Sequence, residues 1–347
     1  MHTDEVTEVS PRFAIPRFMR AAAIDRFGPP EVLTVHTLPV PKPNAQEVLI
    51  AVDIAGVGVW DAKARSGAWA EHDDFPLVLG VDGAGTVVAV GSRVRRLRAG
   101  DRVYSYSYDN PKGGFYAEYV AVAASKVAPV PEGLDPLEAG AVPVIALTAL
   151  QGVDDALGLE AGESVIIHGA SGNVGMLAVQ FAKLRGARVL ATASGRAGQD
   201  FARRLGADAA VNGKRGDIVA AAHRLAPGGI DAVLAFTGGK ELTRCLDALR
   251  KGGRAAYPNG IEPEPRKRKG IRIKAYDAVA GVREFERLRR AIEESELQIP
   301  IAAVFDLEEA RFAHERVEKR HLLGKVVLRS AGVPPARVGR PRPAPSL

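Results

Sequence analysis

The chain has 347 residues, of which 46% are hydrophobic and 25% charged, a composition typical of a soluble globular protein with about two domains. It contains no uncharged apolar run of about 18 residues, which excludes a membrane-spanning helix, and no secretory-signal pattern, which favours a cytoplasmic protein. Its single cysteine, Cys245, excludes an intrachain disulfide and a zinc site made of several cysteines. Much of the net charge of +6 lies in residues 266–274 and 336–347, which we interpret as solvated segments, so a nucleic-acid partner is not expected.

Residues 1–18 precede the first fold-like pattern, and we interpret them as a flexible N-terminal extension. Between residues 19 and 136, short apolar segments such as "EVLIAVDIAGVG" and "GTVVAVGS" alternate with turn sequences such as "AGDRVY" and "NPKGG". This pattern predicts a mostly-β portion with little helix.

Residues 137–280 have a different pattern, in which strands and helices alternate. The strand-like "ESVIIHG" is followed by "VGMLAVQFAKLRG", whose apolar residues recur at helical spacing, and then by the strand-like "ARVLATA". Further alternations up to "RAAYPNG" predict an α/β domain with a Rossmann-type, doubly wound parallel sheet. Residues 281–330 add the helix-like "VREFERLRRAIEES" and the strand-like "GKVVLR", and the Pro- and Arg-rich residues 331–347 predict a disordered tail.

The turn after the first strand of this domain, within "VIIHGASGNVG" (residues 165–175), carries three glycines. Gly169 allows a tight turn, Gly172 allows a diphosphate to approach the backbone, and Gly175 allows the helix to pack closely on the sheet. The free N–H groups at the start of the helix suit an anion. We therefore predict a dinucleotide site here, the alternative being a tight turn without a ligand; its predicted residues are Ala170, Ser171, Gly172, Asn173 and Val174.

The end of the second strand indicates which dinucleotide is preferred. NAD sites normally place an Asp or Glu there to bind the ribose hydroxyls. This chain has Ser194, Gly195 and Arg196 at that point, and the first acid, Asp200, is already inside the following helix. Ser194 and Arg196 can bind a 2′-phosphate, which predicts NADP(H) as the cofactor. The alternative is that Arg196 is an exposed arginine in the first turn of a helix.

Several motifs together resemble the medium-chain dehydrogenase/reductase superfamily, and most closely its zinc-free, zeta-crystallin-like quinone oxidoreductases. They are "FGPPEVL", "GVDGAGTVVAVGSRVRRLRAGDRVY", "GGFYAEYV", "HGASGNVG" and "GKVVL", spread between Met19 and Arg329. The resemblance implies a GroES-like domain built from both chain ends, with the Rossmann domain inserted between them, an active site in the cleft, a homodimer, and Thr148 near the nicotinamide. Because Rossmann ligands lie at the carboxyl edge of the sheet, Thr237, Asn259 and Gly260 are further predicted cofactor residues; turn chemistry alone would also explain glycine and asparagine there.

The resemblance also raises the question of a metal. In zinc-dependent relatives two cysteines and a histidine hold the catalytic ion, and the matching positions here are Gly58, Val81 and Val144. None of these side chains can bind a metal, and Asp82, where relatives keep an acid beside the ion, supplies one carboxylate only. The sequence predicts no metal site.

Hydride transfer without a metal suits an acceptor that is already electron-poor, such as a quinone or an α,β-unsaturated carbonyl. Such a site needs orientation and a donor or two for the acceptor's oxygen. No acid–base constellation is evident, and we interpret His168, beside the glycine turn, as a structural histidine bonded to the backbone.

On the substrate side this sequence departs from the zeta-crystallin-like pattern, because Gly58 and Lys63 replace an Asn and a Tyr. We predict that Lys63 donates to a substrate oxygen and that aromatic side chains line the pocket, chiefly Trp60 and Tyr116, with Trp69 and Tyr108 as further candidates; each could equally be a packing or surface residue. The predicted function is zinc-independent, NADPH-dependent reduction of a small-molecule quinone or enone. Two alternatives stay open: reduction of acyl-CoA thioesters, suggested by the basic "RKRKGIRIK", and a cofactor-binding protein with an RNA-binding or structural role.

Overall fold

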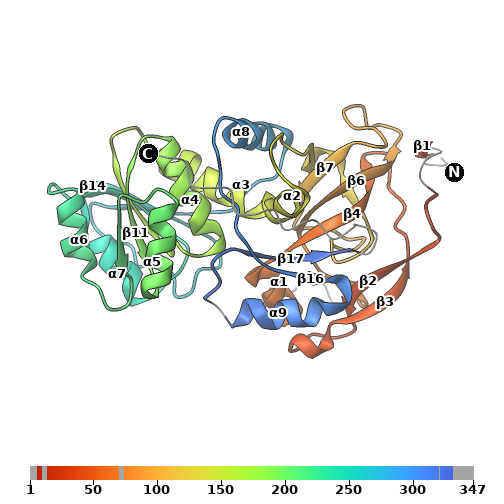
Figure 1. The fold of residues 1–347 in the computed structure, drawn as a ribbon, viewed down its shortest axis with the longest axis horizontal. Helices are drawn as coiled ribbons and strands as arrows, with labels where there is room; N and C mark the ends of the chain where they lie inside the picture. Colours follow the sequence, from red (N-terminus) through yellow and green to blue (C-terminus); the bar gives the residue numbers. More distant parts are fainter. Residues whose placement is uncertain (1–5, 10–13, 70–73, 320, 331–347) are drawn as a thin grey trace.

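The computed structural model of the protein describes residues 6–9, 14–69, 74–319 and 321–330 (Figure 1). These residues form three sheets, which make up two parts of the molecule. A β-rich part contains the first and the last described strands, and a parallel α/β part is formed by the middle of the chain. In Figure 1, β17 from the last described residues lies beside β4 from the first part of the chain. None of the helices in these described ranges is both long and apolar enough to cross a bilayer.

The β-rich part is an eight-stranded sheet, with the path β16-β17-β4-β6-β7-β9 and with β1 on β6 and β8 on β4, together with the three-stranded sheet β3-β2-β5. Its central strand β4 is long and mostly buried, and it pairs antiparallel with β6, β8 and β17. The strands are β1 (Val6–Val9), β2 (Phe18–Ile24), β3 (Thr34–Pro39), β4 (Glu47–Val57), β5 (Leu77–Val78), β6 (Asp82–Gly91), β7 (Arg102–Tyr106), β8 (Tyr119–Ala123), β9 (Val127–Pro129), β16 (Ile301–Asp306) and β17 (Lys325–Arg329).

The β-rich part also contains short helices. They are α1 (Val59–Arg65), α9 (Ala310–Glu318) and the 3₁₀ helices η1 (Pro30–Val32), η2 (Ala124–Lys126) and η4 (Leu307–Glu309). Residues 6–9, within the segment predicted as a flexible extension, form β1 and pair antiparallel with β6, whereas the flexibility of the extension stays a prediction. Backbone hydrogen bonding to a sheet edge creates this strand, and the local composition gave no sign of it. The predicted tail, 331–347, lies outside the described residues.

The second part is the predicted parallel sheet. Its six strands run in the order β12-β11-β10-β13-β14-β15, and every neighbouring pair is parallel. Strands and helices alternate as β10 (Ser164–His168), α4 (Asn173–Leu184), β11 (Arg188–Ala193), α5 (Gly195–Arg204), β12 (Ala209–Asn212), α6 (Ile218–Leu225), β13 (Ile230–Ala235), α7 (Lys240–Asp247), β14 (Leu249–Pro258) and β15 (Arg272–Tyr276). The doubly wound architecture predicted from the sequence is confirmed.

Consecutive residues of β10 explain why both faces of this sheet are covered. Side chains alternate across a strand, and Ile167 belongs to the core formed with α4 and α5, whereas Ile166 belongs to the core formed with α6 and α7. Both residues are fully buried. A continuous apolar strand such as "SVIIH" is therefore what a sheet between two helical layers requires.

Two helical segments join the parts. The chain leaves the β-rich sheet through α2 (Pro136–Ala141), α3 (Pro143–Gln151) and the π-helical turn η3 (Gly152–Leu157), and it returns through α8 (Val282–Glu293). Phe285 of α8 packs against Tyr104 of β7, with ring centroids 4.9 Å apart, and lies in the same core as α3. Since α8 contacts both parts, the boundary placed at residue 281 stays a prediction.

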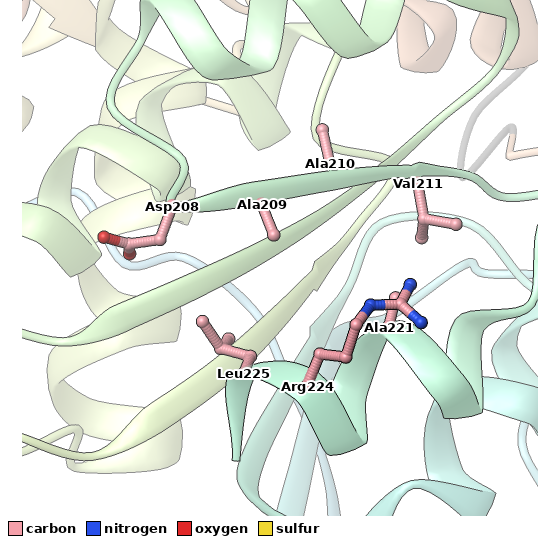
Figure 2. A pocket seen from close by; sticks show the side chains of 7 residues that line it. All are labelled: Asp208, Ala209, Ala210, Val211, Ala221, Arg224 and Leu225. Atoms are coloured by element: carbon pink, nitrogen blue, oxygen red, sulfur yellow. The ribbon is translucent and has the colours of Figure 1, made fainter.

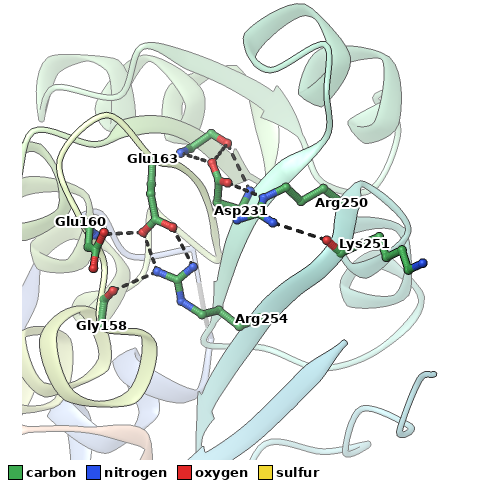
Figure 3. A network of polar contacts seen from close by, with 8 residues as sticks. Gly158, Glu160, Glu163, Asp231, Arg250, Lys251 and Arg254 are labelled. Carbon is green, nitrogen blue, oxygen red and sulfur yellow. Dashed lines mark hydrogen bonds and ion pairs between the residues drawn. The ribbon is translucent and has the colours of Figure 1, made fainter. Parts of the chain in front are cut away.

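A polar network ties together the amino ends of three parallel strands (Figure 3). Arg254 of β14 donates to both carboxylate oxygens of Glu163, just before β10, and to the carbonyl oxygen of Gly158. Nearby, the Asp231 carboxylate of β13 accepts from Arg250 and from the backbone N–H of Ser164. These contacts lie at the edge opposite the carboxyl ends, so they fix the sheet and leave the ligand edge free.

Candidate active site

The glycine turn has the geometry of an anion cradle. Gly169 follows β10 with a φ of +84°, and α4 begins at Asn173 with Gly172 as its N-cap; no described side chain caps the helix. A Cβ on Gly175 would lie 2.2 Å from the Gly169 carbonyl oxygen, so the helix packs against the turn at a distance only glycine permits. A Cβ on Gly172 would approach only that same oxygen, at 3.3 Å, so the other side of Gly172 is open. Uncapped first-turn N–H groups beside an open glycine fit a diphosphate.

The remaining predicted residues of the turn differ in their burial and in their hydrogen bonds. Ala170 is fully buried and donates its N–H to the Thr192 carbonyl oxygen at 3.0 Å, so it serves the turn itself. Ser171, Asn173 and Val174 are half-buried at the start of α4. Thr237, two residues after the end of β13, lies close to the turn, because its Cγ2 would be 3.5 Å from a Cβ placed on Gly169. The structure therefore brings Thr237 to the cradle, as the sheet-edge rule predicts.

The tip of β11 carries the residues predicted to select the cofactor. Ser194 is the N-cap of α5, Gly195 has a φ of +72°, and the Arg196 side chain is 96% exposed, with its Nε 3.8 Å from Asp200. His321 was not predicted from the sequence, and its Nδ1 lies 3.4 Å from Ser194 Oγ. His321 reaches this tip from the segment before β17, so only tertiary structure could place it.

His168 ends β10 as a buried neutral residue. Burial is the main cause that lowers its pKa to about 4. Its Nδ1 lies 2.6 Å from Thr192 Oγ1 and 3.6 Å from Cys245 Sγ, so its partners are side chains and not the backbone that we predicted. Burial raises the pKa of the Cys245 thiol to about 12, which leaves it as a packing residue.

The β-rich part and the α/β part touch at the loop after β14. Lys63 Nζ of α1 donates to the Gly260 carbonyl oxygen at 3.2 Å and lies 4.3 Å from the centre of the Trp69 ring. A Cβ on Gly260 would fall 2.4 Å from that ring. Asn259 donates to Asp277 at 2.6 Å. The predicted substrate residue Lys63 and the predicted cofactor residue Gly260 are thus neighbours, although here they bind each other.

The positions of the metal ligands in zinc-dependent relatives have a different role in this chain. The backbone N–H of Gly58 donates to Asp61 Oδ2 at 2.7 Å, and the N–H of Val144 donates to Asp82 Oδ2 at 3.3 Å. Gly58, Val81 and Val144 have no side-chain donor atom, so the donor set does not fit zinc. Within the described ranges no group of three or more His, Cys, Asp or Glu side chains is arranged to hold a metal ion.

A buried lysine lies in the region of these metal-ligand positions instead. Lys325 of β17 is fully buried, with its Nζ 3.9 Å from Asp82 Oδ1 and 4.6 Å from the centre of the Trp60 ring. Burial raises the pKa of Asp82 to about 6, against the opposing effect of Lys325. Burial and the charge of Asp82 raise the pKa of Asp61 to about 7. Sequence reasoning missed Asp61 and Lys325, although Lys325 stands in the "GKVVL" motif; nothing in the sequence showed that its charge is buried.

The other residues of this region are placed as follows. Trp60 is half-buried, and its ring lies over the Lys325 amino group. The same ring packs against Gly58, since a Cβ placed on Gly58 would fall 2.1 Å from it. Thr148 Oγ1 donates to the Val144 carbonyl oxygen, one helical turn earlier in α3. Tyr116 is fully buried in the β-rich core, with its hydroxyl 3.3 Å from His314 Nε2. The Tyr116 ring therefore packs in a core, and its predicted role in the substrate wall stays a prediction.

Two surface cavities lie elsewhere. One, of about 310 Å³, runs along the edge strand β12 above α6, between Asp208, Val211, Arg224 and Leu225 (Figure 2), and contains no predicted site residue. The other, of about 610 Å³, lies between α7 and the basic loop, and its lining includes Gly239, Lys240 and residues 263–268.

A parallel sheet with an open glycine cradle, joined to a β-rich domain by both chain ends, is the architecture of a dinucleotide-dependent oxidoreductase. Comparison with known families agrees: residues 44–132 match the family described as alcohol dehydrogenase GroES-like domain, and residues 173–267 match zinc-binding dehydrogenase. The chain belongs to the medium-chain dehydrogenase/reductase superfamily, as its motifs indicated.

Three relatives illustrate the likeness. The quinone oxidoreductase of Sus scrofa is 33% identical, over 90% of this chain and 98% of its own. The solved quinone oxidoreductase of Coxiella burnetii is 32% identical, with a TM-score of 0.82 over 90% of this chain and 99% of its own. A mycobacterial relative solved in complex with NADPH is 26% identical, with a TM-score of 0.81 over 90% of this chain and 99% of its own. The protein is thus a quinone oxidoreductase-like member of the superfamily.

Proposed function

We propose that the protein is a zinc-independent, NADPH-dependent reductase that transfers a hydride to a quinone or an α,β-unsaturated carbonyl. The observation that carries the proposal is the combination of an open glycine cradle with Gly58, Val81 and Val144 at the positions that hold the metal in zinc-dependent relatives. A cofactor that carries its own hydride needs no metal when the acceptor is electron-poor. The quinone oxidoreductases among the relatives support the substrate class.

The chain's own residues would bind and orient the two reactants. The first-turn N–H groups of α4, beside Gly172, would hold the diphosphate, and Thr237 would border it. Bound NADPH supplies the hydride. Trp60 offers a flat apolar face at the β-rich side, where an aromatic acceptor can stack. Holding two reactants face to face removes much of the entropic barrier to their reaction.

The preference for NADPH over NADH is supported by charge at the tip of β11. No acid follows Ala193 before Asp200, so nothing there repels a 2′-phosphate. Arg196 points into solvent with nearly its whole side chain exposed and can form a charge-assisted contact. The mycobacterial relative, solved with NADPH, agrees with this choice.

Reduction of acyl-CoA thioesters is the second candidate, because one observation favours it. The cavity of about 610 Å³ is lined by Lys240, Arg266, Lys267 and Arg268, and it begins two residues after Thr237. Cationic side chains next to the cofactor edge can hold the phosphates of CoA. The binding of RNA by the same basic loop has less support, since Arg268 is already paired with Asp247.

The experiment that tests the proposal is a cofactor-oxidation screen of NADPH and NADH against a simple quinone, an enone and crotonyl-CoA. We expect the fastest oxidation with NADPH and the quinone or enone. A higher rate on crotonyl-CoA would favour the second candidate. The same assay after exhaustive chelation tests the metal: turnover that is lost with EDTA and restored by zinc would contradict the zinc-independent reaction. We further propose a homodimer, which light scattering would show.

A further inference from the structure

Four buried polar atoms in one region of the β-rich part have no hydrogen-bond partner among the described residues. They are Trp60 Nε1, Asp61 Oδ1, Asp82 Oδ1 and Lys325 Nζ. Three of them belong to ionisable side chains that are at most 1% exposed. A buried polar atom without a partner costs about 1–3 kcal/mol, and four of them together indicate a site that a polar ligand completes.

The charges in this region do not balance when every group is ionised. Lys325 contributes one positive charge, and Asp61 and Asp82 contribute two negative charges. Burial raises the pKa of both carboxyl groups, that of Asp61 to about 7 and that of Asp82 to about 6, so both hold their protons more tightly than an exposed aspartate does. The region therefore holds a buried amino group beside two carboxyl groups, of which Asp61 has the higher pKa.

The cluster adjoins the helix that carries a predicted cofactor residue. Asp82 accepts from the N–H of Val144 at the start of α3, the helix that leads into the α/β part. Thr148, predicted from the family resemblance to lie near the nicotinamide, is one turn further along that helix and is bonded to Val144. One helical turn rises about 5.4 Å, so the N–H that Asp82 accepts and the predicted cofactor residue stand next to each other on α3.

The cluster lies one side chain below the surface. Trp60, which covers Lys325, is half-buried, and so are Val81 and Tyr106, which flank Asp82 along its strand and across the β6–β7 register. Access of an oxygen atom to the Lys325 amino group and to the indole N–H requires the Trp60 ring to move aside. Two donors and an acid match a carbonyl oxygen that becomes an oxyanion.

We propose that Lys325, Trp60 and the Asp61–Asp82 pair form the pocket that binds the acceptor's oxygen, with Lys325 supplying the positive charge that a metal ion would otherwise provide and the carboxyl pair supplying a proton. This inference rests on the proposed function and deepens it.

The acceptor takes a hydride from the reduced nicotinamide at its β-carbon or ring carbon, and the π electrons of the conjugated system move to its oxygen. That oxygen, held by Lys325, takes the proton of the carboxyl pair. The pair regains a proton from solvent. The acceptor has then gained two electrons and two hydrogens, and the cofactor has been oxidised by two electrons.

A binding experiment tests the pocket without turnover. 4-Nitrophenol resembles a reduced quinone, and its ionised form absorbs visible light, so binding to an oxyanion pocket raises the phenolate signal at fixed pH. Titration into protein saturated with NADP⁺ measures the affinity. We expect the wild-type protein to bind the phenolate form and Lys325→Met to bind it at least about tenfold more weakly, because the only cation of the cluster is lost.

The opposite variant distinguishes the pocket from general damage to the core. Asp82→Asn removes a negative charge and leaves Lys325 in place, so phenolate binding should become severalfold tighter. Lys183→Met is the matched control, since Lys183 pairs with Asp208 on the other side of the α/β part, and its binding should not change. If Lys325→Met does not fold, the double variant Lys325→Met/Asp82→Asn removes both charges together and should show the same loss.

Three results would overturn the pocket: no phenolate binding by the wild-type protein, unchanged binding by Lys325→Met, or equal weakening by Lys325→Met and Asp82→Asn. Failure of the proposed function gives a different result, namely no NADPH oxidation by the wild-type protein with any quinone or enone, whatever the phenolate titration shows.

Discussion

Two glycines of the same turn should respond in opposite ways to replacement by alanine. In Gly172→Ala the new Cβ meets only the Gly169 carbonyl oxygen, at 3.3 Å, and the backbone φ of −81° suits any residue. The lower entropy of the unfolded chain offsets most of the loss of a good N-cap, so the free energy of unfolding should change by less than about 1 kcal/mol. Binding of NADPH should weaken at least about tenfold, because the methyl group occupies the approach of the diphosphate.

Gly175→Ala should damage the fold instead. Its Cβ would lie 2.2 Å from the Gly169 carbonyl oxygen and 2.8 Å from Ala170 Cα, both of them backbone atoms that cannot swing away. Helix α4 must then retreat by about 1 Å from a turn against which its buried face is packed, and overpacking of this kind costs on the order of 2–4 kcal/mol.

Thermal unfolding and fluorescence titration with NADPH, carried out on both variants, separate the two effects. Gly172→Ala should leave the unfolding temperature unchanged and weaken NADPH binding. Gly175→Ala should lower the unfolding temperature. If Gly172→Ala bound NADPH as tightly as the wild-type protein, the diphosphate would not lie against this glycine and the cradle assignment would be wrong.

Three further predictions follow from single contacts. Arg196→Ala should weaken NADPH at least about tenfold more than NADH in parallel titrations, because only NADPH offers the 2′-phosphate. Arg254→Met should lower the free energy of unfolding by about 2–3 kcal/mol at neutral pH, since it leaves the Glu163 carboxylate without its main partner. Arg254 lowers the pKa of Glu163, so the pair stabilises the fold above the ordinary pKa of a glutamate and loses that effect as the pH falls through the lowered value. Asp61→Asn should remove a loss of stability that the wild-type protein shows as the pH rises from about 4 to about 7, because the folded state holds the Asp61 proton in that window and the unfolded state does not.

Each of these predictions has a result that contradicts it. Equal effects of Arg196→Ala on both cofactors would remove the case for a 2′-phosphate contact. For Arg254→Met, the control is Arg98→Met, whose ion pair with Asp101 leaves the arginine side chain 85% exposed; similar unfolding midpoints in urea for the two variants would show that the network of Figure 3 adds little. For Asp61→Asn, parallel stability curves between pH 4 and pH 7 for variant and wild type would mean that Asp61 titrates normally.

The parts of the fold that the sequence predicted are those with strong local periodicity. The apolar run "SVIIH" and the helical spacing after Gly172 gave β10 and α4 close to their observed bounds, since strands and helices bury side chains at different periods. β1 was missed because its residues gain strand structure only by pairing with β6, a partner about 80 residues away in sequence.

In the candidate site too, features set by local sequence could be predicted and features set by long-range packing could not. The cofactor side could be read from the sequence, because the glycines after β10 and the tip of β11 are local turns whose chemistry follows from residue type. The substrate side could not. Tyr116 was expected in a pocket wall and lies in a core, and Lys63 is bonded to Gly260 from the other part of the molecule.

By itself the sequence determined the family, the parallel sheet, the glycine cradle and the absence of metal-binding side chains at three positions, because each of these depends on residue type and on spacing within a short segment. Only the tertiary structure decided that Lys325, Asp82 and Asp61 share one buried region, and that His321 reaches Ser194. The physical reason is that burial and electrostatic coupling depend on which distant segments pack together. A lysine near the end of the chain carries no local sign that its ammonium group will be removed from water and placed beside an aspartate more than 200 residues away.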